Sequence, residues 1–163
     1  MFGFGKNKKE DTGILLASPV KGKAVSLSEV NDPTFSECML GKGMAVIPTE
    51  GKIYAPADGE IVLVFDTLHA VSMTTTEGVE ILIHVGLDTV TRKGDGFTSH
   101  VGNGDKVKKG DLLLTVDLEA LKAAGFDTIT PVVVCNTDDY ADVLGVTSGE
   151  VNVGDALIDV KEN

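Results

Sequence analysis

The chain has few of the residues that mark zinc, thiol-redox and membrane proteins. Only two cysteines occur in 163 residues, Cys38 and Cys135, and neither lies in the C-x-x-C spacing of a zinc or redox site. No apolar run approaches the roughly 18 to 20 residues that a membrane-spanning helix needs. The H-E-x-x-H and H-x-H spacings of zinc hydrolases are also missing. The sequence therefore disfavours a metal site complete within the chain and a membrane-embedded helix.

Basic residues are also scarce. The chain carries 14 Lys and Arg against 25 Asp and Glu, a formal net charge of −11, which argues against nucleic acid as a partner. Residues 1–12 contain a small lysine cluster but no apolar core of a secretory signal, so we expect a cytoplasmic protein. We expect residues 1–12 to form a flexible leader and residues 13–163 a single domain, long enough to bury a core without disulfides.

Strand signals outnumber helix signals along the chain. Nineteen glycines and many short runs rich in valine, isoleucine and threonine predict an all-β fold, an antiparallel β-sandwich with very little helix. One helix is expected at residues 118–124, ended by Gly125, and a second helical turn within residues 138–144. The predicted strands are residues 23–27, 43–48, 52–54, 59–66, 70–74, 79–85, 112–117 and 156–160.

Two turn motifs occur twice. Residues 19–22 and 56–59 both read Pro-x-x-Gly before a strand, and residues 107–111 and 151–155 both read Val-x-x-Gly-Asp. Proline fixes φ at the entry to a turn, and glycine takes the conformation that a β-carbon would forbid. The duplication predicts a barrel-sandwich-like architecture built from two related halves.

Two of the three histidines flank one predicted hairpin. Along an extended segment 65–71, the side chains of Thr67, His69 and Val71 share a face, and His84 ends the next strand. With a four-residue loop at residues 75–78, His69 and His84 face each other directly. A three-residue loop ending at Gly78 shifts the pairing by one residue and places the two imidazoles on opposite faces.

A facing pair of imidazoles has two chemical uses, beside the alternative that the two histidines are unrelated. It can supply two nitrogens to zinc, with His69 and His84 as ligands that a partner or water must complete. Alternatively, one neutral imidazole nitrogen accepts a phosphoryl group while the second imidazole and a threonine hydroxyl hold its oxygens. Thr67 lies on the expected face for the latter role.

The segment Gly78-Val-Glu-Ile-Leu-Ile-His84-Val-Gly-Leu-Asp-Thr-Val90 resembles the active-site signature of the glucose-family IIA component of the bacterial phosphoenolpyruvate-dependent sugar phosphotransferase system. Further segments that carry the resemblance are Ala17-Ser-Pro19, Phe65-Asp-Thr67-Leu-His69-Ala70, Lys93-Gly-Asp-Gly-Phe97, Thr130-Pro-Val132 and Gly149-Glu-Val-Asn-Val-Gly154. Members of this family are antiparallel β-sandwiches, in agreement with the predicted strands. The likeness covers nearly the whole chain outside the leader.

The resemblance implies a phosphohistidine carrier that needs no cofactor. The facing histidine pair by itself predicts a conditional zinc site, weak unless a partner or water completes it. His84 is implied as the residue phosphorylated on Nε2, His69 as the partner that contacts the phosphoryl group, and Thr67 as the group that orients His69. The implied donor is the histidine phosphocarrier protein, and the implied acceptor is the cysteine of a sugar-specific IIB domain. A regulatory binding protein that contacts transporters or metabolic enzymes through the same face is the alternative function.

An apolar collar around the histidines is expected to exclude water and to dock these partners. Its members are Phe35, Met39, Met44, Phe65, Val71, Leu82 and Leu87, and each could equally be a core residue. Asp32 and Asp88 match acidic positions of the family beside this face. The chain departs from relatives that carry phenylalanine at positions 71 and 82. His100 matches no functional position.

Zinc peptidases of the lysostaphin type and lipoyl or biotinyl carriers have similar strand-and-turn motifs. The peptidases need an H-x-H ligand pair and the carriers need a modified lysine at a hairpin tip, and the sequence offers neither. These two classes are therefore disfavoured.

Overall fold

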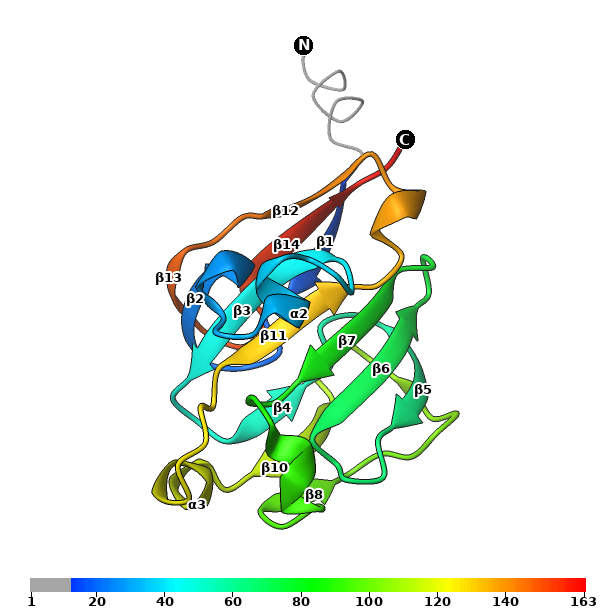
Figure 1. Cartoon of the computed structure of the whole chain (residues 1–163). Coiled ribbons are helices and arrows are strands. Elements are labelled where there is room, and N and C mark those ends of the chain that lie inside the picture. Colours follow the sequence, from blue (N-terminus) through cyan, green and yellow to red (C-terminus); the bar gives the residue numbers. More distant parts are fainter. Residues whose placement is uncertain (1–12) are drawn as a thin grey trace.

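The structure is a computed structural model that describes residues 13–163, so the predicted leader lies outside the described residues. Strands dominate, as predicted (Figure 1). They are β1 (Gly13–Ala17), β2 (Gly22–Ser26), β3 (Lys42–Pro48), β4 (Lys52–Tyr54), β5 (Gly59–Val64), β6 (Ala70–Thr75), β7 (Glu80–His84), β8 (Phe97–Ser99), β9 (Lys106–Val107), β10 (Leu112–Val116), β11 (Thr130–Val134), β12 (Asp142–Gly145), β13 (Gly149–Val151) and β14 (Ala156–Lys161). The helical segments are η1 (Leu27–Glu29), α2 (Pro33–Ser36), η2 (Thr89–Arg92), α3 (Leu118–Ala123) and η3 (Thr137–Asp139).

One large sheet packs against two small ones. The large sheet has the strand order β13-β2-β3-β11-β7-β6-β5-β9, and the small sheets have the orders β1-β14-β12 and β4-β10-β8. Every strand pair is antiparallel. The predicted antiparallel β-sandwich is therefore confirmed.

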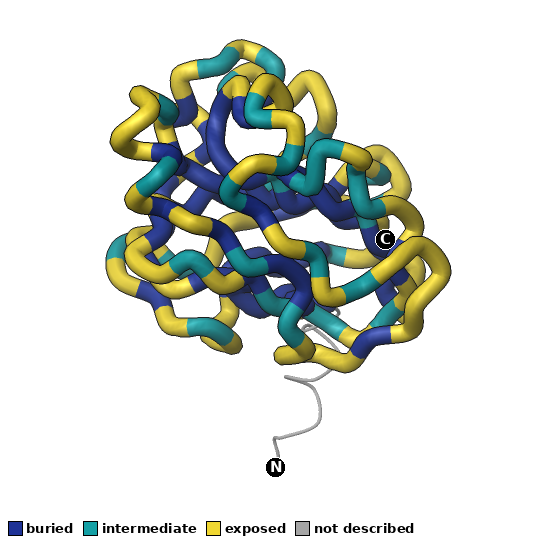
Figure 2. Tube along the Cα trace, turned by 90° about the horizontal axis from the view of Figure 1, so that it is seen from below, coloured by how far each residue is buried: buried dark blue, intermediate teal, exposed yellow. Residues whose placement is uncertain are grey.

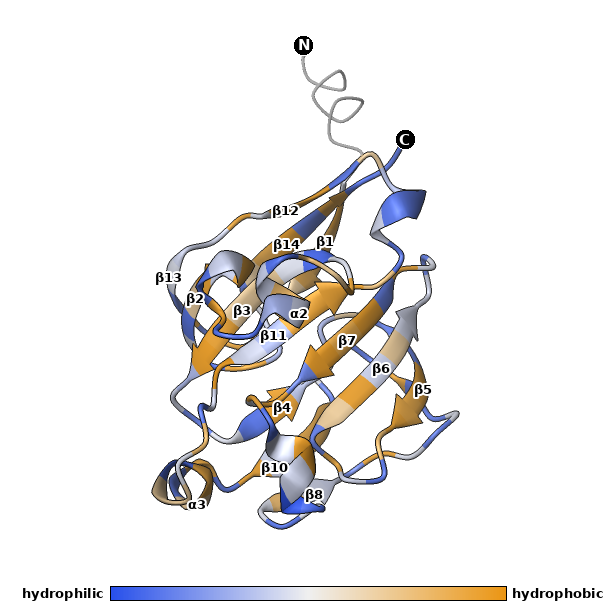
Figure 3. Ribbon diagram, viewed as in Figure 1, coloured by the Kyte–Doolittle hydropathy of each residue, from blue (hydrophilic) through white to orange (hydrophobic). Residues whose placement is uncertain are grey.

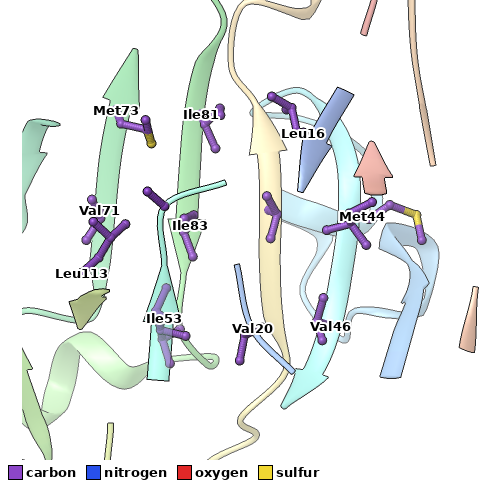
Figure 4. Close-up of a cluster of buried hydrophobic side chains, with 14 of the residues drawn as sticks. Leu16, Val20, Met44, Val46, Ile53, Val71, Met73, Ile81, Ile83 and Leu113 are labelled. Atoms are coloured by element: carbon purple, nitrogen blue, oxygen red, sulfur yellow. The ribbon is translucent and has the colours of Figure 1, made fainter. Parts of the chain in front are cut away.

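Alternation along the strands of the large sheet gives it two different faces. On β7, Ile81 and Ile83 point into the main core, together with Val71 and Met73 of β6 (Figure 4). We call this the inner face; Leu113 of a small sheet lies in the same core. Apolar residues gather in the strands (Figure 3), and the buried positions lie inside a shell of exposed loops (Figure 2).

The opposite face, here called the outer face, has a smaller core of its own. Val25, Ala45 and Val133 point to this side from β2, β3 and β11, where residues from the η1–α2 segment cover them. Val30 and Phe35 of that segment are 3% exposed. Because its side chain alternates with the inner-facing Ile83, His84 also belongs to the outer face.

The duplicated turns form matched hydrogen bonds, in support of two related halves. The N–H of Ala17 donates to the carbonyl of Pro56 at 3.0 Å, and the N–H of Tyr54 donates to the carbonyl of Pro19 at 2.7 Å. In the second motif, the carboxylates of Asp111 and Asp155 accept from the N–H groups of residues 108 and 152, at 2.9 and 2.8 Å. Each turn is thus fastened by the same bond at the same position.

The eight predicted strands all exist, with ends that differ by at most two residues, and α3 ends before Gly125, which has φ +89°. The helical turn expected within residues 138–144 is largely wrong, because η3 stops at Asp139 and β12 begins at Asp142. Strand β11 was not predicted, since proline is rare inside a central strand. Pro131 is tolerated because the ladder of β11 with β7 begins only at Val132, so the missing N–H costs no bond there.

No helix among the described residues is long and apolar enough to cross a membrane.

Candidate functional site

The hairpin of β6 and β7 has the three-residue loop rather than the four-residue loop. The N–H of Thr75 bonds to the carbonyl of Val79 at 2.9 Å, and Gly78, with φ +96°, closes the turn. The register pairs Ala70, not His69, with His84. The prediction that the two histidines occupy directly opposed strand positions is therefore wrong.

The two imidazoles nevertheless meet, because His69 lies outside the strand. The segment expected to be extended forms a tight turn, in which Phe65 N–H bonds to the carbonyl of Ala70 and Leu68 has φ +62°. With regular alternation and this register, the His69 side chain would point to the inner face. Because the turn interrupts the alternation, the side chain instead points toward His84. The ring centroids of His69 and His84 lie 4.8 Å apart with an interplanar angle of 82°.

A backbone carbonyl fixes the tautomer of His84. Nδ1 of His84 lies 2.8 Å from the carbonyl oxygen of Gly86, which can only accept, so Nδ1 carries the proton. Nε2 consequently keeps its lone pair. Gly86 has φ +78°, and a β-carbon there would lie 2.7 Å from Thr89 Cγ2 and 2.9 Å from Asp127 O. Gly86 was not among the predicted site residues; its signal in the sequence is a glycine two residues after His84.

Thr67 contacts His69 through the same tight turn. The Thr67 hydroxyl lies 2.8 Å from Nδ1 of His69. Because this bond occupies Nδ1, the other nitrogen of His69, Nε2, remains for a different partner. The structure thus brings Thr67, His69 and His84 together, as the sequence predicted, although by a different backbone path.

Burial keeps both imidazoles neutral. His69 is 4% exposed, and burial together with the neighbouring His84 lowers its pKa from 6.5 to about 4. Burial also lowers the pKa of His84, while the Gly86 carbonyl, Asp32 and Asp88 act in the opposite direction. These oxygens would stabilise a positive charge formed on the His84 ring.

Two aromatic rings flank the pair. The Phe35 ring centroid lies 5.1 Å from that of His84, and the Phe65 ring centroid lies 5.5 Å from that of His69. Phe35 is held by the short helix α2, whose N-cap Asp32 accepts from Thr34 N–H at 3.0 Å and whose first residue is Pro33. The histidines therefore have apolar neighbours on both sides.

Two residues of the predicted docking collar, Val71 and Met44, point away from the histidines. Val71 is fully buried and Met44 is 8% exposed, and both belong to the main core on the inner face. The Met44 side chain packs so closely against Gly145 that a β-carbon there would overlap its sulfur. Both residues are therefore core residues, because strand alternation turns them away from the histidines.

The remaining predicted collar residues lie on the outer side, with different exposure. Phe35 and Leu87 belong to the smaller core, and Leu82 is 9% exposed on β7 beside His84. Phe65 and Asp32 are half-buried, and Asp88 is exposed.

Three large apolar side chains on these loops reach solvent. Met39, a member of the predicted collar, is 68% exposed after α2; Leu40 and Val90, which were not predicted, are 42% and 49% exposed. Leu40 follows Met39 in the turn after α2, and Val90 lies in η2, two residues after Asp88. We call Met39, Leu40 and Val90 the exposed apolar triad.

The histidine pair offers two nitrogen ligands and no more. With Nδ1 of each ring already bonded, Nε2 of His69 and Nε2 of His84 are the nitrogens left for zinc. Within residues 13–163, no group of three His, Cys, Asp or Glu side chains could hold a metal ion. The third histidine, His100, is exposed, and its Nε2 lies 2.7 Å from the Thr115 hydroxyl, with no part in this pair.

Comparisons with known proteins show the family to which the chain belongs. A family model described as "phosphoenolpyruvate-dependent sugar phosphotransferase system, EIIA 1" matches residues 14–140. The chain is 43% identical over 166 residues to the PTS system glucose-specific EIIA component of Halalkalibacterium halodurans, covering 99% of this chain and 96% of that protein.

A longer relative and a solved structure give the same result. The chain is 47% identical over 144 residues to the PTS system beta-glucoside-specific EIIBCA component of Bacillus subtilis strain 168, covering 88% of this chain but only 24% of that protein. It superposes on glucose permease IIA from Mycoplasma capricolum with a TM-score of 0.83 and 38% identity, over 90% of this chain and 95% of that chain. The chain belongs to the EIIA 1 family of the phosphoenolpyruvate-dependent sugar phosphotransferase system.

Proposed function

We propose that the protein carries a phosphoryl group on Nε2 of His84, accepting it from the histidine phosphocarrier protein and passing it to the cysteine of a sugar-specific IIB domain. The observation that carries this proposal is the bond from His84 Nδ1 to the Gly86 carbonyl, which leaves Nε2 with its lone pair beside a second neutral imidazole. A neutral imidazole nitrogen is the nucleophile that such a transfer needs.

In the first transfer, the Nε2 lone pair of His84 attacks phosphorus, and the bond between phosphorus and the donor's histidine nitrogen breaks. The electron pair of that bond returns to the donor imidazole. The His84 ring, protonated at Nδ1, then gains positive charge. The Gly86 carbonyl, Asp32 and Asp88 favour that charge, as their effect on the pKa of His84 indicates.

His69 acts on the phosphoryl oxygens rather than on phosphorus. If the Thr67 hydroxyl donates to Nδ1 of His69, the ring proton resides on Nε2, which then donates to a phosphoryl oxygen. With a pKa of about 4, His69 is a neutral donor at pH 7. It can therefore stabilise the transferring group without repelling the developing positive charge of His84.

The second transfer reverses these roles. A thiolate of the IIB domain attacks phosphorus, the bond to Nε2 of His84 breaks, and the nitrogen recovers its lone pair. Phe35 and Phe65 shield the pair from water, which would otherwise hydrolyse the phosphoramidate.

Docking of the phosphocarrier protein and of a IIB domain needs an apolar surface near the histidines, with charged residues around that apolar surface. The exposed apolar triad and half-buried Phe65 supply apolar area, and Asp32 and Asp88 lie beside His84. The net charge of −11 would accelerate encounter with a basic patch on a donor. A relative whose name combines EIIB, EIIC and EIIA parts in one protein supports a IIB domain as the acceptor.

The test uses the histidine phosphocarrier protein loaded with a radioactive phosphoryl group. We expect wild type and His100→Ala to become labelled, since His100 lies outside the site, and His84→Ala to remain unlabelled. We expect His69→Gln to accept label but to pass it to a IIB domain slowly, because loss of the helper raises a transfer barrier. Label retained by folded His84→Ala would overturn the proposal.

A regulatory binding role through the same face predicts a different outcome. Wild type would then bind a transporter or metabolic enzyme while taking no label from the phosphorylated donor. The labelling experiment therefore separates the two functions.

A further inference from the structure

The only two cysteines of the chain, 97 positions apart, line one cavity. Cys38 lies in the turn after α2, and Cys135 directly follows β11. The cavity has a volume of about 210 Å³, and both thiols are free and exposed. Neither thiol has a part in the phosphoryl transfer described above.

Backbone contacts hold the two segments against each other. Gly41, whose N–H bonds to the Cys38 carbonyl, lies so close to Val134 that a β-carbon at position 41 would overlap the Val134 carbonyl oxygen. The Thr137 hydroxyl accepts from Lys42 N–H at 3.0 Å and donates to the Val134 carbonyl at 2.6 Å. The turn of Cys38 is therefore fastened to the segment that contains Cys135. Figure 1 shows this turn beside the end of β11.

We propose that Cys38 and Cys135 form an oxidisable dithiol pair, which closes to an intramolecular disulfide on reaction with a peroxide. The disulfide thereby alters the turn that carries Met39 and Leu40 of the exposed apolar triad.

Hydrogen peroxide is the oxidant in this reaction. One thiolate attacks a peroxide oxygen, the O–O bond breaks, and a sulfenic acid and hydroxide result. The second thiolate then attacks the sulfenic sulfur, the S–O bond breaks, and the disulfide forms as hydroxide leaves; with the two thiol protons, two waters are released. Partial desolvation and the neighbouring Glu80 raise the pKa of the Cys135 thiol, so the reaction should accelerate with rising pH.

Closure fixes the separation of the two cavity walls, because a disulfide needs α-carbons within about 7 Å. One wall is the exposed turn of residues 38–41, which carries Met39 and Leu40, two members of the exposed apolar triad. The same turn follows α2, which holds Phe35 against the His84 ring.

A disulfide that constrains this turn therefore affects Met39 and Leu40, which we propose contact the partner proteins. It also affects Phe35, which packs against the proposed nucleophile His84. This regulatory consequence rests on the proposed function, whereas disulfide formation does not. We expect oxidation to slow phosphoryl acceptance by about fivefold, a coupling within the usual range for two linked sites.

The first experiment measures the disulfide alone. The reduced full-length protein is treated with hydrogen peroxide, and intact mass and peptide mapping follow. We expect the loss of two hydrogens, one cross-link between residues 38 and 135, and reversal by dithiothreitol. Cys38→Ser and Cys135→Ser are the controls, and neither can form the cross-link. Oxygen adducts without a cross-link, or disulfide-linked dimers in its place, would overturn the proposal.

The second experiment compares label uptake from the phosphorylated histidine phosphocarrier protein before and after oxidation, with Cys38→Ser treated identically. A slower oxidised wild type beside an unaffected Cys38→Ser is the expected result. Equal rates with a complete cross-link would contradict the regulatory consequence. A reduced protein that takes no label would instead contradict the proposed function, and the mass measurement would still stand.

Discussion

Nδ1 of His84 and the carbonyl oxygen of Gly86 lie 2.8 Å apart, joined across the bend that ends strand β7. This bond uses the proton that would otherwise be free to reside on Nε2. It also places a carbonyl dipole against the ring, where positive charge develops if the other nitrogen attacks phosphorus. Gly86 is thus a positioning residue for the proposed nucleophile.

Replacing Gly86 with alanine should therefore impair both stability and transfer. Its φ of +78° disfavours any other residue, and the added β-carbon would lie 2.7 Å from the Thr89 side chain. We expect a loss of about 2 kcal/mol or more in the free energy of unfolding, measured with urea, and slower label uptake.

Gly78→Ala is the matched control for this substitution. Gly78 also has a positive φ, +96°, but a β-carbon there would contact nothing within 4 Å. We expect a loss of about 1 kcal/mol and unchanged label uptake. Equal effects of the two substitutions on transfer would show that the Gly86 carbonyl has no special role.

Thr67→Val should slow transfer while leaving the fold largely intact. The substitution keeps the shape of the side chain but removes the hydroxyl that bonds to Nδ1 of His69. We expect transfer to fall by about 10-fold to 100-fold, because His69 loses its fixed tautomer. Nitrogen-15 NMR of the His69 ring should report a mixture of tautomers in the variant.

Thr67→Ser restores the hydroxyl and should restore both the rate and the NMR spectrum. A valine variant with wild-type rates, or a serine variant as slow as valine, would contradict the role assigned to Thr67.

The buried histidine predicts how stability depends on pH. The pKa of His69 is about 4 in the folded protein, against 6.5 ordinarily, so between these values the unfolded chain binds a proton that the folded protein does not. The free energy of unfolding therefore contains the full contribution of neutral His69 above pH 6.5. This contribution falls as the pH drops toward 4, by at most about 3 kcal/mol.

Urea unfolding of wild type and His69→Gln between pH 7.5 and 4.5 isolates this contribution. The wild type should lose more stability than the variant as the pH falls. Parallel curves for the two proteins, or an NMR titration of His69 with a midpoint near 6.5, would refute the assignment.

Zinc should bind the histidine pair weakly. Nε2 of His84 can supply one ligand, and Nε2 of His69 supplies a second when the Thr67 hydroxyl accepts from Nδ1–H of His69 instead of donating to Nδ1. Water or a partner's carboxylate must complete the tetrahedron. Calorimetry should give weak binding to the unphosphorylated protein and none after phosphorylation, which consumes one nitrogen. Submicromolar binding that survives in His69→Ala/His84→Ala would place the zinc elsewhere.

The sequence predicted the sandwich well because alternation, glycine turns and duplicated motifs are local signals. The hairpin register could not be predicted in the same way. A loop shorter by one residue moves every side chain to the other face, and nothing in residues 75–78 decides between the two lengths. The histidines meet despite the different register because Leu68 adopts a left-handed conformation. Leucine rarely adopts this conformation, so the sequence does not predict the turn.

The docking collar was predicted less well for a related reason. An apolar residue near the histidines in sequence can face the main core, as Val71 and Met44 do. Exposure depends on what covers each position, so the exposed Leu40 and Val90 gave no sequence signal that separated them from core residues. The role of Gly86 depends on a carbonyl, which every residue possesses. Its positive φ and the close contacts that a β-carbon would make explain why the residue is glycine.

The central claim is that Nε2 of His84 carries the phosphoryl group while Nδ1 keeps its proton. Phosphorus-31 and nitrogen-15 NMR of the protein, labelled at its histidines and phosphorylated by the histidine phosphocarrier protein, tests it directly. We expect phosphorus–nitrogen coupling to Nε2 of His84 and a protonated Nδ1 still bonded to the Gly86 carbonyl. Coupling to Nδ1, or to either nitrogen of His69, would contradict it.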